Sequence, residues 1–82
     1  MSIDVYTKYG CSPCKFLKMW LNKNEISFNE KPVELKKNMD EFIKRQGTGY
    51  PFIIIKHANG ENVFLGNTPK LKKHLRGEYF NS

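Results

Sequence analysis

The sequence has only two cysteines, and none of its apolar runs approaches the length of a membrane-spanning helix. Small secreted domains usually carry several disulfides. The two cysteines here are separated by only two residues, and closing so short a loop stabilises a fold by only about 2 kcal/mol. The first residues also lack the basic stretch and apolar core of a signal peptide. We therefore expect a cytoplasmic protein that makes no membrane contact.

Acidic residues are scarce relative to basic ones. The chain has 8 aspartates and glutamates against 14 lysines and arginines, for a net charge of +6. This surplus fits either a lysine-rich solvated surface or steering toward an acidic protein or nucleic acid. A nucleic-acid-binding module would show a clustered basic stripe or an aromatic signature, and the sequence has neither. We therefore do not expect nucleic acid as a partner.

The length and the apolar content predict one small domain. Eighty-two residues leave no room for a second domain. A hydrophobic fraction of 39% with 6 Phe, 4 Tyr and 1 Trp is enough for a compact core. We expect a single domain over residues 1–82 that acts as a monomer, with a loosely held tail over residues 78–82.

Apolar residues that alternate or run together predict four short strands, and apolar residues at helical spacing predict three helices. The strands are expected over residues 3–7, 26–30, 51–55 and 62–65, and the helices over residues 13–23, 34–46 and 69–77. Pro32 is expected to close the second strand, because proline cannot donate to a ladder. The expected boundary signals are Gly47 as C-cap, Asn59-Gly60 as hairpin turn and Thr68-Pro69 as helix start.

The order of these elements predicts a mixed α/β fold. A strand–helix–strand unit favours a right-handed crossover that pairs its two strands in parallel. The later hairpin adds an antiparallel edge. The result is a four-stranded mixed sheet flanked by three helices.

The two cysteines form the motif Cys11-Ser12-Pro13-Cys14, which lies between a predicted strand and a predicted helix. Such a pair passes between dithiol and disulfide with little backbone movement. An ordinary thiol has a pKa of about 8.5, and its thiolate is the nucleophile. The unpaired N–H groups of the first helical turn point toward Cys11, and Lys8 lies three residues upstream. Both effects are expected to lower the pKa of Cys11 below its usual value.

The chemistry predicted for this pair is thiol–disulfide exchange. Cys11 attacks a substrate disulfide, and Cys14, one helical turn further inside, resolves the mixed disulfide. Two alternatives are incidental cysteines and a zinc or iron–sulfur site. The two imidazoles, His57 and His74, have 16 residues between them, against roughly three to five in a finger-type ligand pair. We therefore expect no metal and no tightly bound cofactor.

Three segments resemble the glutaredoxin family in order and spacing. They are Thr7-Lys8-Tyr9-Gly10-Cys11-Ser12-Pro13-Cys14, Gly49-Tyr50-Pro51-Phe52-Ile53 and Gly66-Asn67-Thr68-Pro69, and the match runs from about Ile3 to Leu75. The resemblance implies a thioredoxin-like fold and an electron carrier that reduces protein disulfides or glutathione mixed disulfides, with Lys8 stabilising the thiolate. It also implies a cis bond before Pro51, which would leave the backbone of Tyr50 to pair with an extended substrate. The residues implied in binding substrate or glutathione are Tyr9, Ser12, Pro13, Tyr50, Pro51, Gly66, Asn67 and Thr68.

The chain departs from many glutaredoxins at two of these segments. Gly49-Tyr50 stands where many have Thr-Val, and no acidic residue follows Gly66 to hold the glutathione amino group. A glycine, variable residues and a proline at this point are similar to the NrdH-redoxin branch. That branch takes electrons from thioredoxin reductase and donates them to class Ib ribonucleotide reductase. The resemblance therefore leaves glutathione, as a co-substrate, and thioredoxin reductase both open as electron sources.

The residues between the cysteines also bear on the reduction potential. Proline lies next to the second cysteine, as it does in thioredoxin. We therefore expect a potential toward that of thioredoxin, which is about −270 mV.

Overall fold

The structure of the chain is a computed structural model that describes residues 1–80, with side chains for residues 1–77. Its seven elements are β1 (Ser2–Thr7), α1 (Ser12–Lys23), β2 (Asn29–Pro32), α2 (Lys36–Lys44), β3 (Phe52–His57), β4 (Gly60–Leu65) and α3 (Pro69–Phe80). The predicted order of strands and helices is confirmed. In the described part of the chain, no helix is long and apolar enough to cross a membrane.

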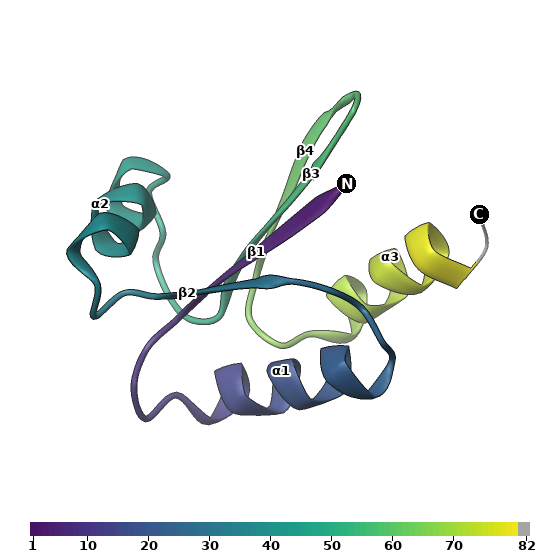
Figure 1. Cartoon of the computed structure of the whole chain (residues 1–82), viewed down its shortest axis with the longest axis horizontal. Coiled ribbons are helices and arrows are strands. Elements are labelled where there is room, and N and C mark those ends of the chain that lie inside the picture. Colours follow the sequence, from purple (N-terminus) through teal and green to yellow (C-terminus); the bar gives the residue numbers. More distant parts are fainter. Residues whose placement is uncertain (81–82) are drawn as a thin grey trace.

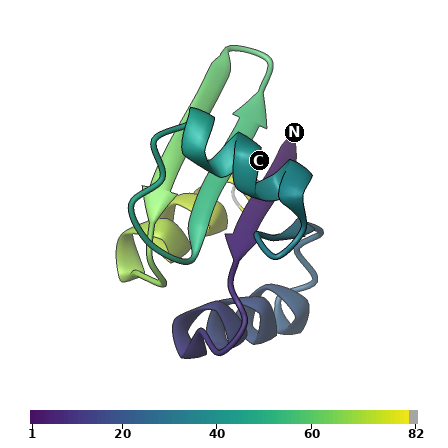
Figure 2. The same ribbon diagram turned by 90° about the vertical axis from the view of Figure 1, so that its left-hand side faces the viewer.

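The four strands form one mixed sheet in the order β2-β1-β3-β4. β1 pairs with β2 in parallel, whereas the β1–β3 and β3–β4 pairs are antiparallel. α1 and α3 lie on one side of this sheet and α2 lies on the other (Figure 1, Figure 2). The predicted architecture of a four-stranded mixed sheet flanked by three helices is therefore confirmed.

The two sides of the sheet have separate apolar clusters, because side chains along a strand alternate between faces. On the first face, which α1 and α3 cover, nine buried residues pack together: Ile3, Val5, Leu17, Leu21, Ile26, Ile53, Ile55, Leu71 and Leu75. On the second face, which α2 covers, the buried cluster is Tyr6, Val33, Phe42, Phe52 and Ile54. The names first face and second face are used for these two sides below.

The second strand is present, but it begins three residues later than the predicted start at residue 26. α1 ends in a Schellman motif in which Glu25 has a φ of +57° and the N–H of Ile26 donates to the carbonyl of Leu21 at 2.9 Å. Because of this motif, Ile26 packs in the core against α1 and does not belong to a strand. β2 runs over Asn29–Pro32 and includes the proline that was expected to end it. β2 is an edge strand of the sheet, where a missing N–H is tolerated.

The second helix is shorter than predicted, and its C-terminus is not capped by Gly47 in the expected way. The left-handed residue is Gln46, with a φ of +59°. The N–H of Gln46 donates to Ile43 and the N–H of Gly47 to Phe42, both at 2.9 Å. Glycine is needed at position 47 for a different reason: a Cβ there would lie 2.6 Å from Cδ1 and Cζ of the Phe42 ring.

The third helix begins as predicted and extends further than predicted. The N–H of Leu71 donates to the Thr68 hydroxyl at 3.2 Å, which confirms Thr68 as the N-cap. The helix then passes through Gly77 and runs to Phe80, so the predicted end at Gly77 is wrong. A helical glycine costs only about 1 kcal/mol, which the rest of the helix can outweigh. The tail expected over residues 78–82 starts inside this helix, and residues 81–82 lie outside the described part.

The hairpin between β3 and β4 is present, with a turn one residue earlier than predicted. His57 pairs with Gly60, so Ala58 and Asn59 form the two-residue turn. Gly60, with a φ of +135°, begins the returning strand. The far end of the hairpin points away from α1 (Figure 1), so this turn lies remote from the cysteines.

Candidate functional site

The two cysteines lie at the start of α1, and a disulfide joins them with a Cα–Cα distance of 5.3 Å. Cys11 is the N-cap residue, and its sulfur accepts the backbone N–H of Cys14 at 3.2 Å. Cys14 is buried and Cys11 is half-buried. The more accessible sulfur is therefore the one that receives a hydrogen bond from the helix start.

The local chain is shaped to place Cys11 at this position. Gly10 has a φ of +77°, a left-handed conformation that glycine adopts at little cost. The N–H of Cys11 then closes the turn on the carbonyl of Lys8 at 3.2 Å. Ser12 and Pro13 follow as the first exposed residues of α1, and a proline in the first turn loses no helical hydrogen bond.

A cleft of about 490 Å³ opens beside the cysteines. It is lined by Thr7, Lys8, Tyr9, Gly10, Cys11, Ser12, Cys14, Lys15, Lys18, Glu30, Pro32 and Glu34. The site residues predicted from the sequence contribute Lys8, Tyr9, Ser12 and both cysteines to this lining. The carboxylates of Glu30 and Glu34 were not predicted there, because their distance along the chain gives no local signal.

Both carboxylates of the cleft are already engaged. Glu34 accepts the backbone N–H of Tyr9 at 2.8 Å, and this hydrogen bond is the main reason that the pKa of Glu34 lies below its ordinary value. Glu30 accepts from the Thr7 hydroxyl at 3.0 Å and from Lys18 Nζ at 2.9 Å. With three lysines, Lys8, Lys15 and Lys18, against these two carboxylates, the lining has one more positive than negative side chain.

Five other predicted site residues form a second group on the β3 side of β1: Tyr50, Pro51, Gly66, Asn67 and Thr68. Pro13 stays in the first turn of α1 and lines neither this group nor the cleft. The Tyr50–Pro51 peptide bond is cis, as the resemblance implied. The carbonyl of Pro51 accepts the N–H of Gly66 at 2.8 Å. Since Phe52 pairs with both Tyr6 and Leu65, these loops meet at the end of the sheet where β1 leads to Cys11 (Figure 1).

The start of α3 presents neutral polar groups beside this second group. The first turn of α3 contains no acidic residue. The Thr68 hydroxyl is used as the N-cap. The buried Oδ1 of Asn67 has no hydrogen-bond partner among the described residues. A glutathione amino group would therefore meet no carboxylate from this turn.

Lys8 connects the two groups of predicted site residues. Its Nζ lies 5.9 Å from the centroid of the Tyr50 ring, within the range of a cation–π contact. The Tyr50 ring stacks on Phe42, with centroids 4.8 Å apart and an interplanar angle of 10°. The sequence analysis did not identify Phe42 as part of the site, because its spacing in α2 marks only a core position.

Comparisons with known proteins support the resemblance stated from the sequence. No protein-family model matches the chain. The chain is 37% identical over 43 residues to the glutaredoxin-like protein NrdH of Lactococcus lactis subsp. cremoris. That match covers 52% of this chain and 56% of the relative, so the chain spans little more than half of the relative's length.

Two solved structures share the architecture over nearly the whole chain. The thioredoxin-like protein BC3987 superposes with a TM-score of 0.71 and 25% identity, over 90% of this chain and 99% of that one. The glutaredoxin-like NrdH-redoxin of Escherichia coli gives 0.72 and 22%, over 92% and 95%. The predicted thioredoxin-like fold and the predicted likeness to glutaredoxin-like and NrdH-type proteins are confirmed.

Proposed function

We propose that this chain is a dithiol–disulfide oxidoreductase, a glutaredoxin-like carrier of electrons to disulfides. The observation that carries the proposal is the Cys11–Cys14 pair at the start of α1, with the outer sulfur accepting a helix N–H and the inner sulfur buried. A helix start stabilises negative charge. The same geometry that holds the disulfide therefore favours a thiolate on Cys11 after reduction.

The reaction consists of two exchanges that conserve sulfur and electrons. The Cys11 thiolate attacks one sulfur of the substrate disulfide, forms a mixed disulfide and expels the other substrate sulfur as a thiolate. The Cys14 thiolate then attacks Cys11, closes the Cys11–Cys14 bond and expels the second substrate thiolate. Two electrons pass from the dithiol to the substrate, and the expelled thiolates take up the protons that the dithiol releases.

The backbone before Pro51 supports binding of an extended segment of the substrate. Within residues 1–77, no hydrogen bond uses the N–H or carbonyl of Tyr50. The loop therefore presents an unpaired backbone edge at the end of the sheet nearest Cys11. An extended peptide can pair with such an edge as an added strand. This edge fits a protein disulfide or the peptide part of a glutathione mixed disulfide.

Substitution of the cysteines tests the reaction. Cys11→Ser removes the attacking sulfur, and we expect reduction of insulin disulfides by the chemically reduced protein to disappear. Cys14→Ser should keep attack on a small glutathione mixed disulfide and lose reduction of protein disulfides that require resolution. Ser27→Ala, in an exposed loop, is the matched control. Full activity of Cys11→Ser would refute the proposal.

Two alternative reductants are proposed to return the Cys11–Cys14 disulfide to the dithiol. The E. coli neighbour is described as a glutaredoxin-like protein with a thioredoxin-like activity profile, and the absence of an acidic residue in the first turn of α3 favours the same profile here. That profile corresponds to recharging by thioredoxin reductase, with ribonucleotide reductase as one acceptor in a reducing cytoplasm. The alternative is recharging by glutathione, held at Gly66, Asn67 and Thr68.

Turnover with each reductant alone separates the two sources. The protein is mixed with excess insulin as the terminal disulfide acceptor and is given either glutathione with glutathione reductase or thioredoxin reductase, and oxidation of NADPH is followed. Faster turnover with thioredoxin reductase supports the thioredoxin-like profile. Faster turnover with glutathione assigns the neutral groups at the start of α3 to glutathione instead.

A further inference from the structure

A continuous stack runs from α2 to the cysteine loop, and it is called the Lys8–Tyr50–Phe42 stack here. Lys8 Nζ lies over the Tyr50 ring at 5.9 Å, and the Tyr50 ring lies nearly parallel to Phe42 at 4.8 Å. Lys8 is also joined to the redox site, because its carbonyl accepts the N–H of Cys11. The stack therefore reaches from a core aromatic residue to a cation in the cleft that contains Cys11.

The inner end of the stack is held firmly. Phe42 is 6% exposed and contacts two further rings, Phe52 edge-on at 5.4 Å and Tyr6 at 6.2 Å. Gly47 leaves no room between the backbone and the Phe42 ring, as its hypothetical Cβ shows. Phe42 therefore has little freedom to move, and it fixes the plane of the Tyr50 ring.

We infer that the Tyr50 ring competes with the Cys11 thiolate for the ammonium group of Lys8. This inference rests on the proposed thiol–disulfide function. In the disulfide, Cys11 is uncharged and the Lys8 ammonium lies over Tyr50. Adding two electrons and a proton gives a Cys11 thiolate and a Cys14 thiol. The new negative charge attracts the Lys8 ammonium. Because Lys8 must leave the Tyr50 ring to approach it, the lost cation–π contact raises the free energy of the thiolate form.

Other charged groups face Cys11 in the same cleft, and they do not belong to the stack. Lys18 is paired with Glu30, and Glu34 accepts from the Tyr9 backbone. Lys15 adds a further cation and Tyr9 a phenol. Substitutions at Tyr50 leave all of these groups in place, so a change in Cys11 ionisation after such a substitution reports on Lys8.

The competition predicts both the sign and the size of an effect. Tyr50→Leu removes the ring that holds Lys8 and should raise the thiolate-to-thiol ratio of Cys11 about two- to fivefold, the range expected for an exposed cation–π contact. The reduced protein is favoured over the disulfide by the same factor. Because a tenfold change corresponds to about 30 mV, the reduction potential should rise by about 10 to 20 mV.

Two measurements on the full chain test this inference. The pH dependence of iodoacetamide labelling of Cys11 gives its thiolate fraction, and equilibration with a glutathione buffer gives the potential. Tyr50→Phe keeps the ring and should behave as the parent. Phe42→Leu loosens the ring and should shift both quantities in the same direction as Tyr50→Leu by a smaller amount.

A double-substitution cycle separates the competition from a structural effect. In a Lys8→Met background, Tyr50→Leu should change neither the thiolate fraction nor the potential, since the cation is absent. Lys72→Met is the matched control, because Lys72 lies 5.7 Å from the Trp20 ring and contributes nothing to the cleft.

Three results would overturn the inference: a lower thiolate fraction in Tyr50→Leu, an unchanged one, or the same shift in the Lys8→Met background. None of these measurements requires turnover. A chain that labels as expected and yet reduces no disulfide would contradict the proposed function alone.

Discussion

The two faces of the sheet differ in what they bury. The first face is sealed by two helices and its cluster is entirely apolar. The second face is covered by the single nine-residue helix α2, and polar side chains lie beside its aromatic cluster. Burial of apolar side chains stabilises the fold, but it has no preferred direction. The second face contains the side chains that position Phe42. Phe42 in turn positions Tyr50, which lies beside the redox site.

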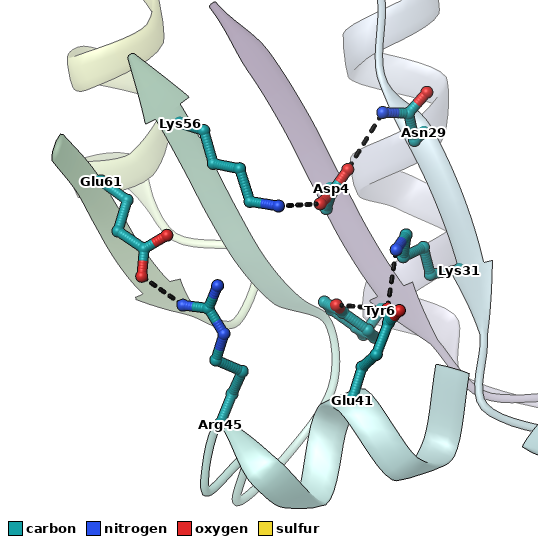
Figure 3. A network of polar contacts seen from close by, with 8 residues as sticks. All are labelled: Asp4, Tyr6, Asn29, Lys31, Glu41, Arg45, Lys56 and Glu61. Carbon is teal, nitrogen blue, oxygen red and sulfur yellow. Dashed lines mark hydrogen bonds and ion pairs between the residues drawn. The ribbon is translucent and has the colours of Figure 1, made fainter. Parts of the chain in front are cut away.

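Figure 3 shows the polar part of the second face, where side chains from several elements meet. Asp4 is 5% exposed and lies between Asn29 Nδ2 at 3.0 Å and Lys56 Nζ at 3.4 Å. Glu41 on α2 accepts from Lys31 Nζ at 2.7 Å and from the Tyr6 hydroxyl at 3.0 Å. The Glu41 contacts attach α2 to β1 and β2 with directional bonds. The Asp4 contacts join β1 to its neighbours β2 and β3.

An ion pair at the open end of this network joins α2 to the hairpin. Arg45, the C-cap residue of α2, pairs with Glu61 on β4 (Figure 3). Both side chains are partly exposed, so this pair contributes little to stability. The pair marks where the C-terminus of α2 meets β4.

The largest expected effect comes from truncating adjacent residues of β3 that point to opposite faces. Ile53 and Ile54 are each 1% exposed, and they belong to the first-face and second-face clusters respectively. Each change to alanine should cost about 2–5 kcal/mol of unfolding free energy. We expect Ile53→Ala to cost more, because the larger cluster cannot collapse around the cavity. Urea denaturation measures both, and an equal loss would contradict the contrast between the faces.

A smaller effect is expected from alanine at Gly47, which follows α2, and at Gly77, which lies within α3. Gly47→Ala forces a Cβ against the Phe42 ring and should destabilise the protein by about 1–3 kcal/mol. Gly77→Ala places a Cβ in open space within α3 and should stabilise it by about 0.5–1 kcal/mol. Thermal unfolding of the two variants should therefore move the midpoint in opposite directions. A stabilising Gly47→Ala would show that Phe42 is not held as described.

The smallest expected effect is a change in the acid dependence of stability. Hydrogen bonds from Lys31 and Tyr6 hold the pKa of Glu41 below its ordinary value of 4.5. A lowered folded-state pKa contributes stability that is present above the unfolded value and lost as the pH falls through the folded value. Glu41→Gln removes this contribution, so its unfolding free energy should fall less steeply between about pH 5 and about pH 3 than that of the parent.

The control for this prediction is Glu25→Gln. Glu25 is an exposed carboxylate that has no ion pair within residues 1–77. Urea titrations across the acid range should give this variant the slope of the parent. If Glu41→Gln also keeps that slope, the network of Figure 3 does not link α2 stability to protonation.

A comparison of the predicted and observed strands shows which features of the fold local sequence patterns can predict. Alternating residues over 3–7 and an apolar run over 51–55 predicted β1 and β3 correctly, because backbone pleating is a local property. The same signal misplaced the start of the second strand at residue 26, where a Schellman motif at Glu25 and Ile26 takes the place of the expected strand. A non-glycine residue in the left-handed region leaves no mark in composition, so the boundary was not visible.

The residues of the candidate site also fall into two groups, those predicted from the sequence and those found only in the structure. Cys11, Cys14 and Lys8 were predicted from spacing, because their relation is fixed within one turn of chain. Glu30, Glu34 and Phe42 were not, since they reach the site from other elements. The helical spacing of Phe42 predicted a core position only, and its stacking on Tyr50 depends on how α2 packs on the sheet.

The amino-acid sequence by itself determined the order of elements and a pair of sulfurs at a strand-to-helix junction. These are properties of neighbours along the chain, set by backbone geometry and side-chain alternation. Only the tertiary structure decided that Lys8 lies over Tyr50, that two distant carboxylates enter the cleft, and that α2 supports the loop before Pro51. Those contacts join residues far apart in sequence, and they exist only once the sheet brings their elements together.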